Sequence, residues 1–295
     1  MRIALAANRA SGGGLDPEPL AAVMRGRGAE VEVFGCRDED LARAAEWGPE
    51  RLVVAGGDGT IGPVAELAGR LGVPLAVLPT GTANDFARAY GVPGNPRAAA
   101  ELAVGADDTR PLELGRLADG RPFVNVASAG LASVAARNAQ PLKPRLGPLA
   151  YGVGALSAAA RERPLPVTVR ADGRTVFDDG AWQVIVAVSG AFGGGSGVAE
   201  ADPDDGVLDV VVLPAGSRAG LARRAWGLRQ RTIAQQRDVP HERGHTVEVD
   251  LPVGSEINVD GEIRQGGLER VTVTPRAFRL VVPAERQPRR FARDA

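Results

Sequence analysis

Short apolar runs alternate with longer mixed stretches along the first hundred residues. The runs have the length of buried strands and occupy Ile3–Ala7, Val31–Phe34, Leu52–Ala55 and Leu75–Leu78. The stretches between them have the period of helices, at Pro17–Arg27, Asp38–Trp47 and Thr60–Leu71. Strands that alternate with helices at this spacing predict an open parallel α/β sheet.

The boundaries of these helices also carry signals. Asp38 has the position and the side chain of an N-cap for the second helix. After the fourth strand, Asn84 and Asp85 open a further helical stretch that extends through Tyr90. Gly91 and the proline two residues later predict its end.

The rhythm changes near residue 108, where short β-branched runs bounded by Gly, Pro or Asp begin. These predicted strands are Arg121–Ala127, Leu165–Arg170, Gln183–Val188, Leu208–Leu213, Thr246–Asp250 and Arg270–Thr274. Two helical segments interrupt them, at about Gly147–Arg163 and Arg218–Gln236. We therefore expect an α/β domain over residues 1–108, a β-rich domain over 109–283 and a polar, frayed tail over 284–295.

Composition removes several classes of chemistry. Lys and Arg total 35 against 36 Asp and Glu, and this net charge of −1 argues against a nucleic-acid-binding surface. Lys143 is the single lysine and precedes a proline, so the chain has no Walker A loop. One cysteine allows neither an internal disulfide nor a Cys-rich zinc site, and His241 and His245 are expected to be structural. The lack of a signal-peptide core and of an apolar run of about 18 residues favours a cytoplasmic protein.

Three loops at the carboxyl ends of predicted strands are rich in glycine or hydroxyl groups. They are Asn8–Gly14, Gly56–Thr60 and Pro79–Asp85. In an open parallel sheet, ligands bind beyond these strand ends, and glycines let backbone amides approach a phosphate closely. The helix that follows the second loop adds the positive end of its dipole. One such loop could be only a tight turn, but three at one sheet edge favour a nucleotide site.

Side chains in these loops complete the predicted site. Ser11, Thr60 and Thr82 offer hydroxyl donors, and Arg9 offers a cation. Asp58, between glycines, is a natural partner for Mg²⁺, either directly or through water. Without a Walker lysine, phosphate has to be held by amides, hydroxyls, metal and Arg9.

Two of these loops carry a family resemblance. Gly56–Thr60 (GGDGT) and Pro79–Arg88 (PTGTANDFAR) together resemble the diacylglycerol kinase catalytic domain family, which includes bacterial soluble lipid kinases and sphingosine and ceramide kinases. GGDG alone is shared with NAD kinases and phosphofructokinases, whereas the second segment is specific to the lipid kinase branch. Later segments continue the resemblance in order, at Phe123–Gly130, Gly193–Gly195, Asp204–Asp209 and Val259–Glu262.

The resemblance implies a fold and a set of ligands. It implies an N-terminal α/β domain like that of NAD kinases and phosphofructokinases, a C-terminal β-rich sandwich-like domain, and an active site in the cleft. It implies an ATP- and Mg²⁺-dependent kinase of lipid metabolism and phospholipid biosynthesis, with a lipid or other hydroxyl-bearing small molecule as acceptor. The cofactor-binding set on this sequence is Asn8, Arg9, Ser11, Gly12, Gly56, Gly57, Asp58, Gly59, Thr60, Thr82, Asn84 and Asp85.

The same resemblance assigns roles to acidic residues. Glu262 matches the general base, and Asp58 and Asp85 match a water-mediated Mg²⁺ network. Glu113 is expected to be a catalytic residue together with Glu262 and Asp58. Asp205, with the carbonyls of Asp202 and Val207, matches a second, structural metal site. From pattern alone, Asp260-Gly261 is equally a plain hairpin turn with Glu262 as a solvated neighbour. The acidic cluster around Asp205 is dense enough for a divalent ion, although such turns are often merely solvated.

The sequence also departs from the family pattern. GGDGT is usually followed by x-Asn-Glu, whereas Ile61-Gly62-Pro63 stands here. Glu113 occupies a position that is usually Asp, and the threonine expected after the second strand is absent around Gly35–Cys36. Three functions therefore stay open: a lipid kinase, a kinase of the same fold for a soluble alcohol or specialised metabolite, and a nucleotide-binding protein that does not catalyse.

The segment Arg218–Arg231 also has two interpretations. It holds five arginines and no acid, with Leu221, Trp226 and Leu228 between them. Such a segment suits the surface of an anionic membrane, as peripheral contact would require. It equally suits a solvated helix with a core-facing stripe. The sequence carries no pattern that indicates an oligomeric state.

Overall fold

The computed structural model describes residues 1–11, 14–106, 108–131, 134, 163–192, 195–198 and 205–284. Gly12, Asp202, nearly all of the helix expected at Gly147–Arg163 and all but the first residue of the expected tail lie outside these described residues. The chain forms two compact units, which are residues 1–112 with 276–295 and residues 113–275. The chain thus returns to the N-terminal unit at its C-terminal end. A division of the sequence into consecutive domains does not include this return.

The first unit is a parallel sheet in the order β17-β4-β3-β1-β2. Its strands are β1 (Arg2–Ala7), β2 (Glu30–Phe34), β3 (Arg51–Gly56) and β4 (Pro74–Pro79), with the end of β17 (Leu268–Val281). All side chains of β3 are buried, as expected for a central strand covered on both faces. The four strands and the parallel sheet that the apolar runs predict are confirmed.

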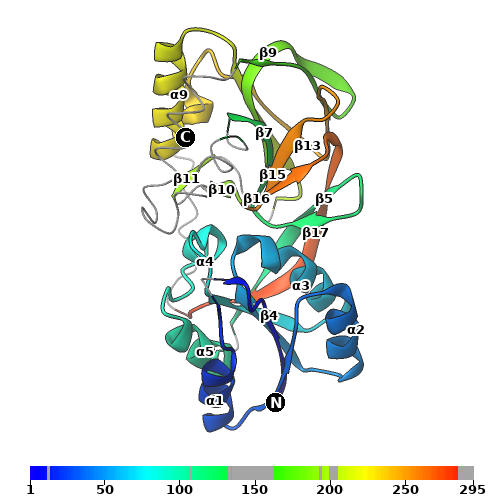
Figure 1. The fold of residues 1–295 in the computed structure, drawn as a ribbon, viewed down its shortest axis with the longest axis vertical. Coiled ribbons are helices and arrows are strands. Elements are labelled where there is room, and N and C mark those ends of the chain that lie inside the picture. Colours follow the sequence, from blue (N-terminus) through cyan, green and yellow to red (C-terminus); the bar gives the residue numbers. More distant parts are fainter. Residues whose placement is uncertain are drawn as a thin grey trace. The chain divides into compact units, whose positions relative to one another are not determined.

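Helices cover both faces of this sheet (Figure 1). They are α1 (Glu18–Gly26), α2 (Asp38–Glu46), α3 (Asp58–Leu71), α4 (Asp85–Ala89) and α5 (Pro96–Gly105). Helices α1 and α5 pack together on one face, and α2 and α3 lie on the other. The expectation for Asp38 is wrong, because Arg37 is the N-cap residue and Asp38 is already helical. Helix α3 begins two residues before the expected Thr60, so Asp58 lies in its first turn.

The second unit is built mainly from antiparallel strands. They are β5 (Thr109–Leu117), which enters it from the first unit, β6 (Pro122–Phe123), β7 (Val126–Gly130), β8 (Leu165–Ala171), β9 (Arg174–Ala187), β10 (Ala191–Phe192), β11 (Ser196–Gly197), β12 (Leu208–Pro214), β13 (His241–Gly244), β14 (Thr246–Asp250), β15 (Glu256–Val259), β16 (Glu262–Gln265) and the first part of β17. Its main sheet runs in the order β16-β15-β7-β9-β8-β14-β17, and β12 and β13 extend it from β9. The β-rich character predicted beyond residue 108 is confirmed.

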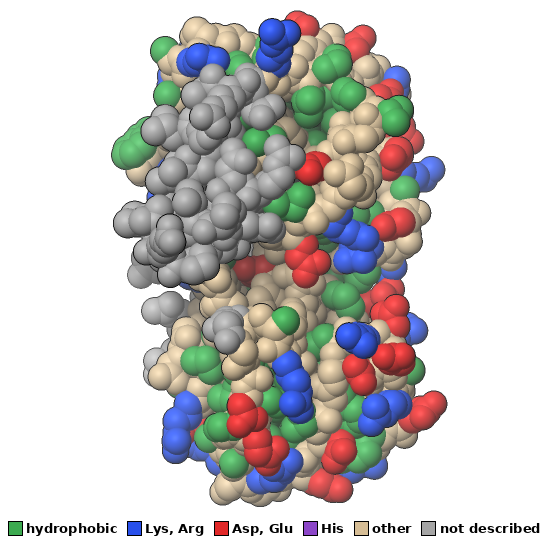
Figure 2. Space-filling view, in the orientation of Figure 1, with side chains coloured by type: hydrophobic (Ala, Val, Ile, Leu, Met, Phe, Trp, Pro, Cys, Tyr) green, Lys and Arg blue, Asp and Glu red, His purple; other side chains and the backbone are tan. Residues whose placement is uncertain are grey.

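Strands β9 and β12 separate two hydrophobic cores. Val184 and Val186 of β9 pack into the larger core, whereas Ile185 and Ala187 face a second core. Helix α9 (Arg218–Gln230) and the short helix η3 (Ile233–Gln235) cover that second core through Leu221 and Ile233. No helix among the described residues combines the length and apolar character that crossing a bilayer requires. The described surface on the face in Figure 2 carries basic and acidic side chains interspersed on each unit.

Candidate functional site

The carboxyl ends of β1, β3 and β4 bring the three predicted loops together. The Asn8 side-chain amide donates to Thr60 Oγ1 at 3.1 Å, and the Ser11 hydroxyl donates to the Thr80 carbonyl at 3.3 Å. The Thr80 amide in turn donates to the Gly56 carbonyl at 3.1 Å. These bonds join segments more than 20 residues apart in sequence, so the three loops form one structure at the sheet edge, as predicted.

Glycine is required where the second and third loops meet. A Cβ on Gly81 would lie 2.5 Å from Gly57 Cα, well inside any normal contact distance. Gly57 is the N-cap of α3 in extended conformation, so the first amides of that helix follow it directly. A closely packed, side-chain-free backbone beside a helix N-terminus is the arrangement that binds phosphate groups.

Asp58 connects the second loop to the third. One of its carboxylate oxygens accepts from the Asp85 amide at 3.1 Å, and the other accepts from the Phe86 amide at 2.8 Å. The carboxylate thereby binds the first amides of α4, a structural role that sequence reasoning did not foresee. A carboxylate offers about four acceptor positions, and these two amides take two of them.

The other predicted cofactor residues differ in exposure. Asp85 is almost fully buried, and its carboxylate accepts from Arg88 at 2.7 Å. Asn84 is the N-cap of α4 at a φ of 50°, and its side chain exchanges two 2.9 Å hydrogen bonds with the backbone of Gly81. Arg9 and Thr82 are exposed to solvent at the rim of the loops.

The second unit holds two of the predicted catalytic residues, and one of them, Glu262, follows a tight hairpin turn. Asp260 and Gly261 connect β15 to β16 with φ angles of 47° and 90°, as a type I′ turn requires. Asp260 is 7% exposed, and its carboxylate accepts the backbone amides of Val124, Asn125 and Val126 at 2.8, 2.9 and 3.0 Å. The turn is therefore a hairpin turn, as the plainer interpretation expects, and it is also bound to the segment that leads into β7.

Glu262 is the first residue of β16, immediately after this turn. Its side chain is 53% exposed and lies 3.8 Å from Arg121 Nη1, in a weak ion pair. The backbone that carries it is fixed by Asp260 and by the bond from the Gly261 amide to Asn258 Oδ1 at 2.9 Å. The structure thus presents a solvent-accessible carboxylate on a rigid support.

Glu113 and Asn125 are buried polar groups of the second unit. Glu113 is 2% exposed and its carboxylate accepts the Gly206 amide at 2.7 Å. Asn125 is equally buried and accepts from the Ser189 hydroxyl at 2.6 Å. Both residues stand in segments that resemble family motifs, but their partners lie 93 and 64 positions away and could not be identified from sequence.

Asp205, which is expected in the second metal site, binds other residues of the chain. The Asp205 carboxylate forms an ion pair with Arg243 and also accepts the Val207 amide. Asp202 lies outside the described residues. Within the described ranges, no group of three or more His, Cys, Asp or Glu side chains is placed to hold a metal ion. The second metal site therefore stays a prediction.

The neighbouring Asp209 gives one histidine a partner that the sequence did not reveal. Asp209 is fully buried on β12, and His241 Nε2 lies 2.6 Å from its carboxylate. Arg243 lies 3.6 Å from the same oxygen. The expectation that His241 is structural agrees with this buried pair.

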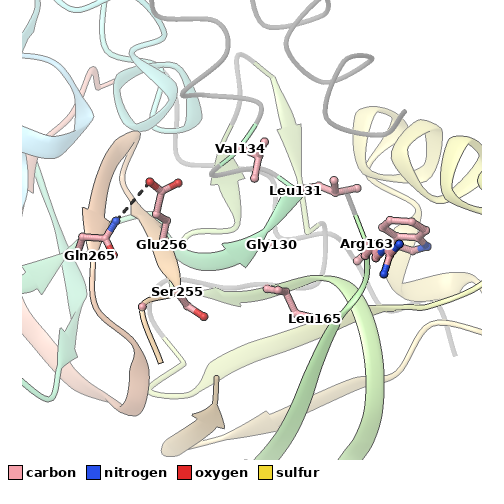
Figure 3. A pocket seen from close by; sticks show the side chains of 10 residues that line it. Gly130, Leu131, Val134, Arg163, Leu165, Ser255, Glu256 and Gln265 are labelled. Carbon is pink, nitrogen blue, oxygen red and sulfur yellow. Dashed lines mark hydrogen bonds between the residues drawn. The ribbon is translucent and has the colours of Figure 1, made fainter. Parts of the chain in front are cut away.

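A cavity of about 250 Å³ lies in the second unit (Figure 3). Leu131, Leu165 and Trp182 supply apolar parts of its lining. Glu256 and Gln265, which share a 3.4 Å hydrogen bond across β15 and β16, supply polar parts. They lie at the end of the hairpin away from its turn. Mixed linings of this kind suit small organic molecules.

One of the departures from the family pattern, at Ile61-Gly62-Pro63, lies within α3. Ile61 and Gly62 are buried, and Pro63 stands inside the helix. Proline has no amide hydrogen, so the Gly59 carbonyl loses its usual helical donor. A polar pair expected at residues 62 and 63 is thus replaced by two residues that offer no side-chain hydrogen bond.

Comparison with known proteins covers both units. Residues 2–117 match the family described as "Diacylglycerol kinase catalytic domain", and residues 125–282 match "YegS C-terminal NAD kinase beta sandwich-like domain". "Probable lipid kinase YegS-like" of Pseudomonas aeruginosa is 35% identical over 282 residues, covering 89% of this chain and 88% of that protein. "Diacylglycerol kinase" of Mycobacterium tuberculosis is 29% identical over 271 residues, covering 88% and 87%.

A solved structure shows the same fold. The crystal structure of a diacylglycerol kinase from Bacillus anthracis superposes with a TM-score of 0.75, at 22% identity, over 96% of this chain and 97% of that one. The predicted fold class, an α/β domain followed by a β-rich sandwich-like domain, is thereby confirmed. With both units matched in order and a relative of 35% identity along most of its length, the chain belongs to the diacylglycerol kinase catalytic domain family, a family of phosphotransferases.

Proposed function

We propose that the protein transfers the γ-phosphate of ATP to a hydroxyl group of diacylglycerol or a related lipid, with Mg²⁺. The observation that carries the proposal is the joined loop structure at the ends of β1, β3 and β4, where glycine is sterically required. In a chain that belongs to a kinase family, this structure is suited to hold the nucleotide's phosphates.

The nucleotide site would use backbone and hydroxyl donors. The first amides of α3 point toward the loop, and Ser11 and Thr60 add hydroxyl groups on either side of it. Thr82 and Arg9 are exposed at the rim, where they can reach the polar parts of the nucleotide. Phosphoryl transfer needs little covalent chemistry from the protein, so positioning by these groups is the main contribution.

Asp58 and Asp85 are the residues that would hold Mg²⁺, through water. The Asp58 carboxylate is held at the start of α4 because it accepts the Asp85 backbone amide. Bound there, Mg²⁺ would neutralise the negative charge that develops during transfer. Glu113 stays a predicted catalytic residue, and its carboxylate accepts the Gly206 amide.

Glu262 is our proposed general base. It would accept the proton of the acceptor's hydroxyl as that oxygen attacks the γ-phosphorus. Its exposure leaves the carboxylate accessible to a ligand, and the hairpin bound by Asp260 fixes its backbone. The apolar part of the cavity lining supports an acceptor with a hydrocarbon portion.

The test is transfer from γ-labelled ATP to a panel of acceptors, with Mg²⁺ and with a chelator. The panel contains diacylglycerol, ceramide and sphingosine, with glycerol and NAD as soluble acceptors. We expect label on a lipid, loss of transfer with the chelator and its return with added Mg²⁺. ATP binding without transfer to any lipid would contradict the proposal, and would favour a soluble acceptor or a non-catalytic protein.

One observation favours the soluble-acceptor kinase as a second candidate. Gly62 and Pro63 replace an Asn-Glu pair typical of the lipid kinase family, next to the proposed phosphate loop. If this change alters the reaction, Gly62→Asn with Pro63→Glu should raise transfer to lipid and lower transfer to the soluble acceptor. Equal changes with both acceptors would contradict the second candidate.

A further inference from the structure

Helix α9 presents a tryptophan to solvent from a cationic surface. Trp226 is 66% exposed, and it is the aromatic residue among the exposed large hydrophobic side chains of the described ranges. The other tryptophan of this unit, Trp182, is 5% exposed. One exposed aromatic residue needs no explanation by itself, so its surroundings decide its meaning.

The outward face of α9 has small residues at its centre and arginines along its edges. Ala222 stands one turn before Trp226 and Ala219 two turns before it, and both are exposed. Arg218 and Arg229 follow one edge of this face, and Arg223 lies on the other. We call this surface, formed by Arg218, Ala219, Ala222, Arg223, Trp226 and Arg229, the α9 face.

The chain segment that carries the α9 face is strongly basic in sequence. Six arginines and a single acidic residue occur between Ser217 and Val239, at Arg218, Arg223, Arg224, Arg229, Arg231, Arg237 and Asp238. That acid, Asp238, accepts from both Arg223 and Arg224. The net charge of this segment is therefore +5, in a protein whose total net charge is −1.

The helix is also anchored firmly enough to present this face. Arg224 is 7% exposed and donates to the Pro214 carbonyl at 2.8 Å and to Asp238 at 2.7 Å. Leu221 is buried in the second core, and the Ser217 side chain caps the first turn through the Gly220 amide at 3.1 Å. The Trp226 side chain therefore has its orientation set by the buried side of the helix and does not contribute to the core.

We propose that the α9 face is a docking surface for an anionic lipid bilayer. Tryptophan prefers the boundary between lipid headgroups and acyl chains, where its ring is partly apolar and its N–H stays hydrated. Arginines around it bind lipid phosphates, each contributing about 1 kcal/mol near an anionic surface. The alanines let the helix approach the bilayer closely, so that the indole reaches below the headgroups.

Vesicle binding tests this docking without nucleotide or acceptor, so its result is independent of the proposed kinase activity. The probes are vesicles of phosphatidylcholine alone and of phosphatidylcholine mixed with phosphatidylglycerol. We expect binding to the mixed vesicles only, weakened by added salt because the attraction is screened. Arg218→Gln with Arg229→Gln should lower the partition coefficient roughly thirtyfold, and Trp226→Ser about tenfold.

Matched variants distinguish the α9 face from a general charge effect. Arg97→Gln with Arg174→Gln removes the same charge from two exposed positions elsewhere, with side-chain exposures of 75% and 73%. This pair should leave vesicle binding within about twofold of the wild type. An equal loss in both pairs would overturn the proposal, as would binding to neutral vesicles or concentration-dependent dimerisation through Trp226 without vesicle binding.

A spectroscopic measurement locates the contact. The chain has three tryptophans, so Trp47→Phe with Trp182→Phe leaves Trp226 as the sole indole. Its emission should shift to the blue on mixed vesicles and be quenched by lipids brominated near the headgroup end of the acyl chain. Unchanged emission at saturating vesicle concentration would overturn insertion of Trp226.

Discussion

The two units build their parts of the candidate site by different means. In the first unit, close approach of backbone at Gly57 and Gly81 shapes the loops at the strand ends. In the second unit, a buried carboxylate, Asp260, accepts three backbone amides and fixes the turn that carries Glu262. The first arrangement depends on the absence of side chains, and the second depends on one ionised side chain.

This difference teaches where each unit is vulnerable. A close approach of two backbone segments is disrupted by a single added methyl group, yet it depends little on charge. A turn held by a carboxylate tolerates changes of shape around it, but it loses its support when the carboxylate is removed or protonated. The predictions below, from the largest expected effect to the smallest, test these two vulnerabilities.

The largest effect is expected at Glu262, where a loss of catalysis can be distinguished from a loss of stability. Glu262→Gln should lower the rate of phosphoryl transfer by about 10²- to 10⁴-fold, because the amide cannot accept the proton. The free energy of unfolding should change by less than about 0.5 kcal/mol, since the side chain is exposed. Steady-state kinetics and urea denaturation measure the two quantities.

Glu242→Gln is the matched control for this change. Glu242 is 44% exposed and lies 3.7 Å from Arg174, much as Glu262 lies 3.8 Å from Arg121. Its activity should stay within about twofold of the wild type. A similar rate loss in both variants, or none in Glu262→Gln, would remove Glu262 from its proposed role as base.

The next effect is on stability and concerns the support of that turn. Asp260→Ala should lower the free energy of unfolding by about 3 kcal/mol, because three backbone amides lose a charged acceptor in a buried place. Asp172→Ala is its counterpart, since Asp172-Gly173 forms an equivalent type I′ turn with an exposed carboxylate. That variant should lose about 1 kcal/mol or less. Equal losses by urea denaturation would show that burial does not distinguish the two turns.

The close approach of Gly57 and Gly81 in the first unit is tested by adding one methyl group. Gly81→Ala places a Cβ 2.5 Å from Gly57 Cα, and relieving that clash costs about 2 kcal/mol of backbone displacement. We expect the dissociation constant for ATP, measured by calorimetry, to rise about thirtyfold. Gly94→Ala is the control, because a Cβ there meets open space. Unchanged ATP affinity in Gly81→Ala would contradict the placement of phosphate on these loops.

Sequence patterns predict the elements of this protein better than their partners. The four strands follow from local apolar runs, and their parallel direction follows from the alternation with helices. Helix α5 escapes the pattern because its sequence, PRAAAELAVG, is dominated by alanine and has little apolar periodicity. The pairing of β17 with β4, at Arg279 with Pro74, joins residues about 200 positions apart, and no local pattern encodes it.

The same distinction applies to the candidate site. The loops containing Gly57 and Gly81 can be predicted from the sequence, because their chemistry is local and their strand ends share one edge of the sheet. The role of Asp260 is not readable, since its amide partners precede it by 134 to 136 residues. A sequence shows which residues are suited to a reaction, whereas the buried groups that hold them in place depend on tertiary contacts.

The smallest expected effect is a pH dependence of stability at the Asp172-Gly173 turn. The carboxylate of this turn can titrate, whereas the closely packed backbone at Gly57 and Gly81 cannot. The Thr246 amide hydrogen bond lowers the pKa of Asp172, and the His245 amide acts in the same direction. A carboxylate whose pKa is lower in the folded state contributes stability above its unfolded pKa of about 3.9 and loses it as pH falls through the folded value.

Asp172→Asn keeps the turn, because asparagine tolerates its φ of 47°, but it cannot titrate. Urea denaturation from about pH 5 down to about pH 2 should therefore show a slightly shallower loss of stability in this variant than in the wild type. Parallel curves would mean that Asp172 has the same pKa folded and unfolded, and that its hydrogen bonds add no acid sensitivity to the second unit.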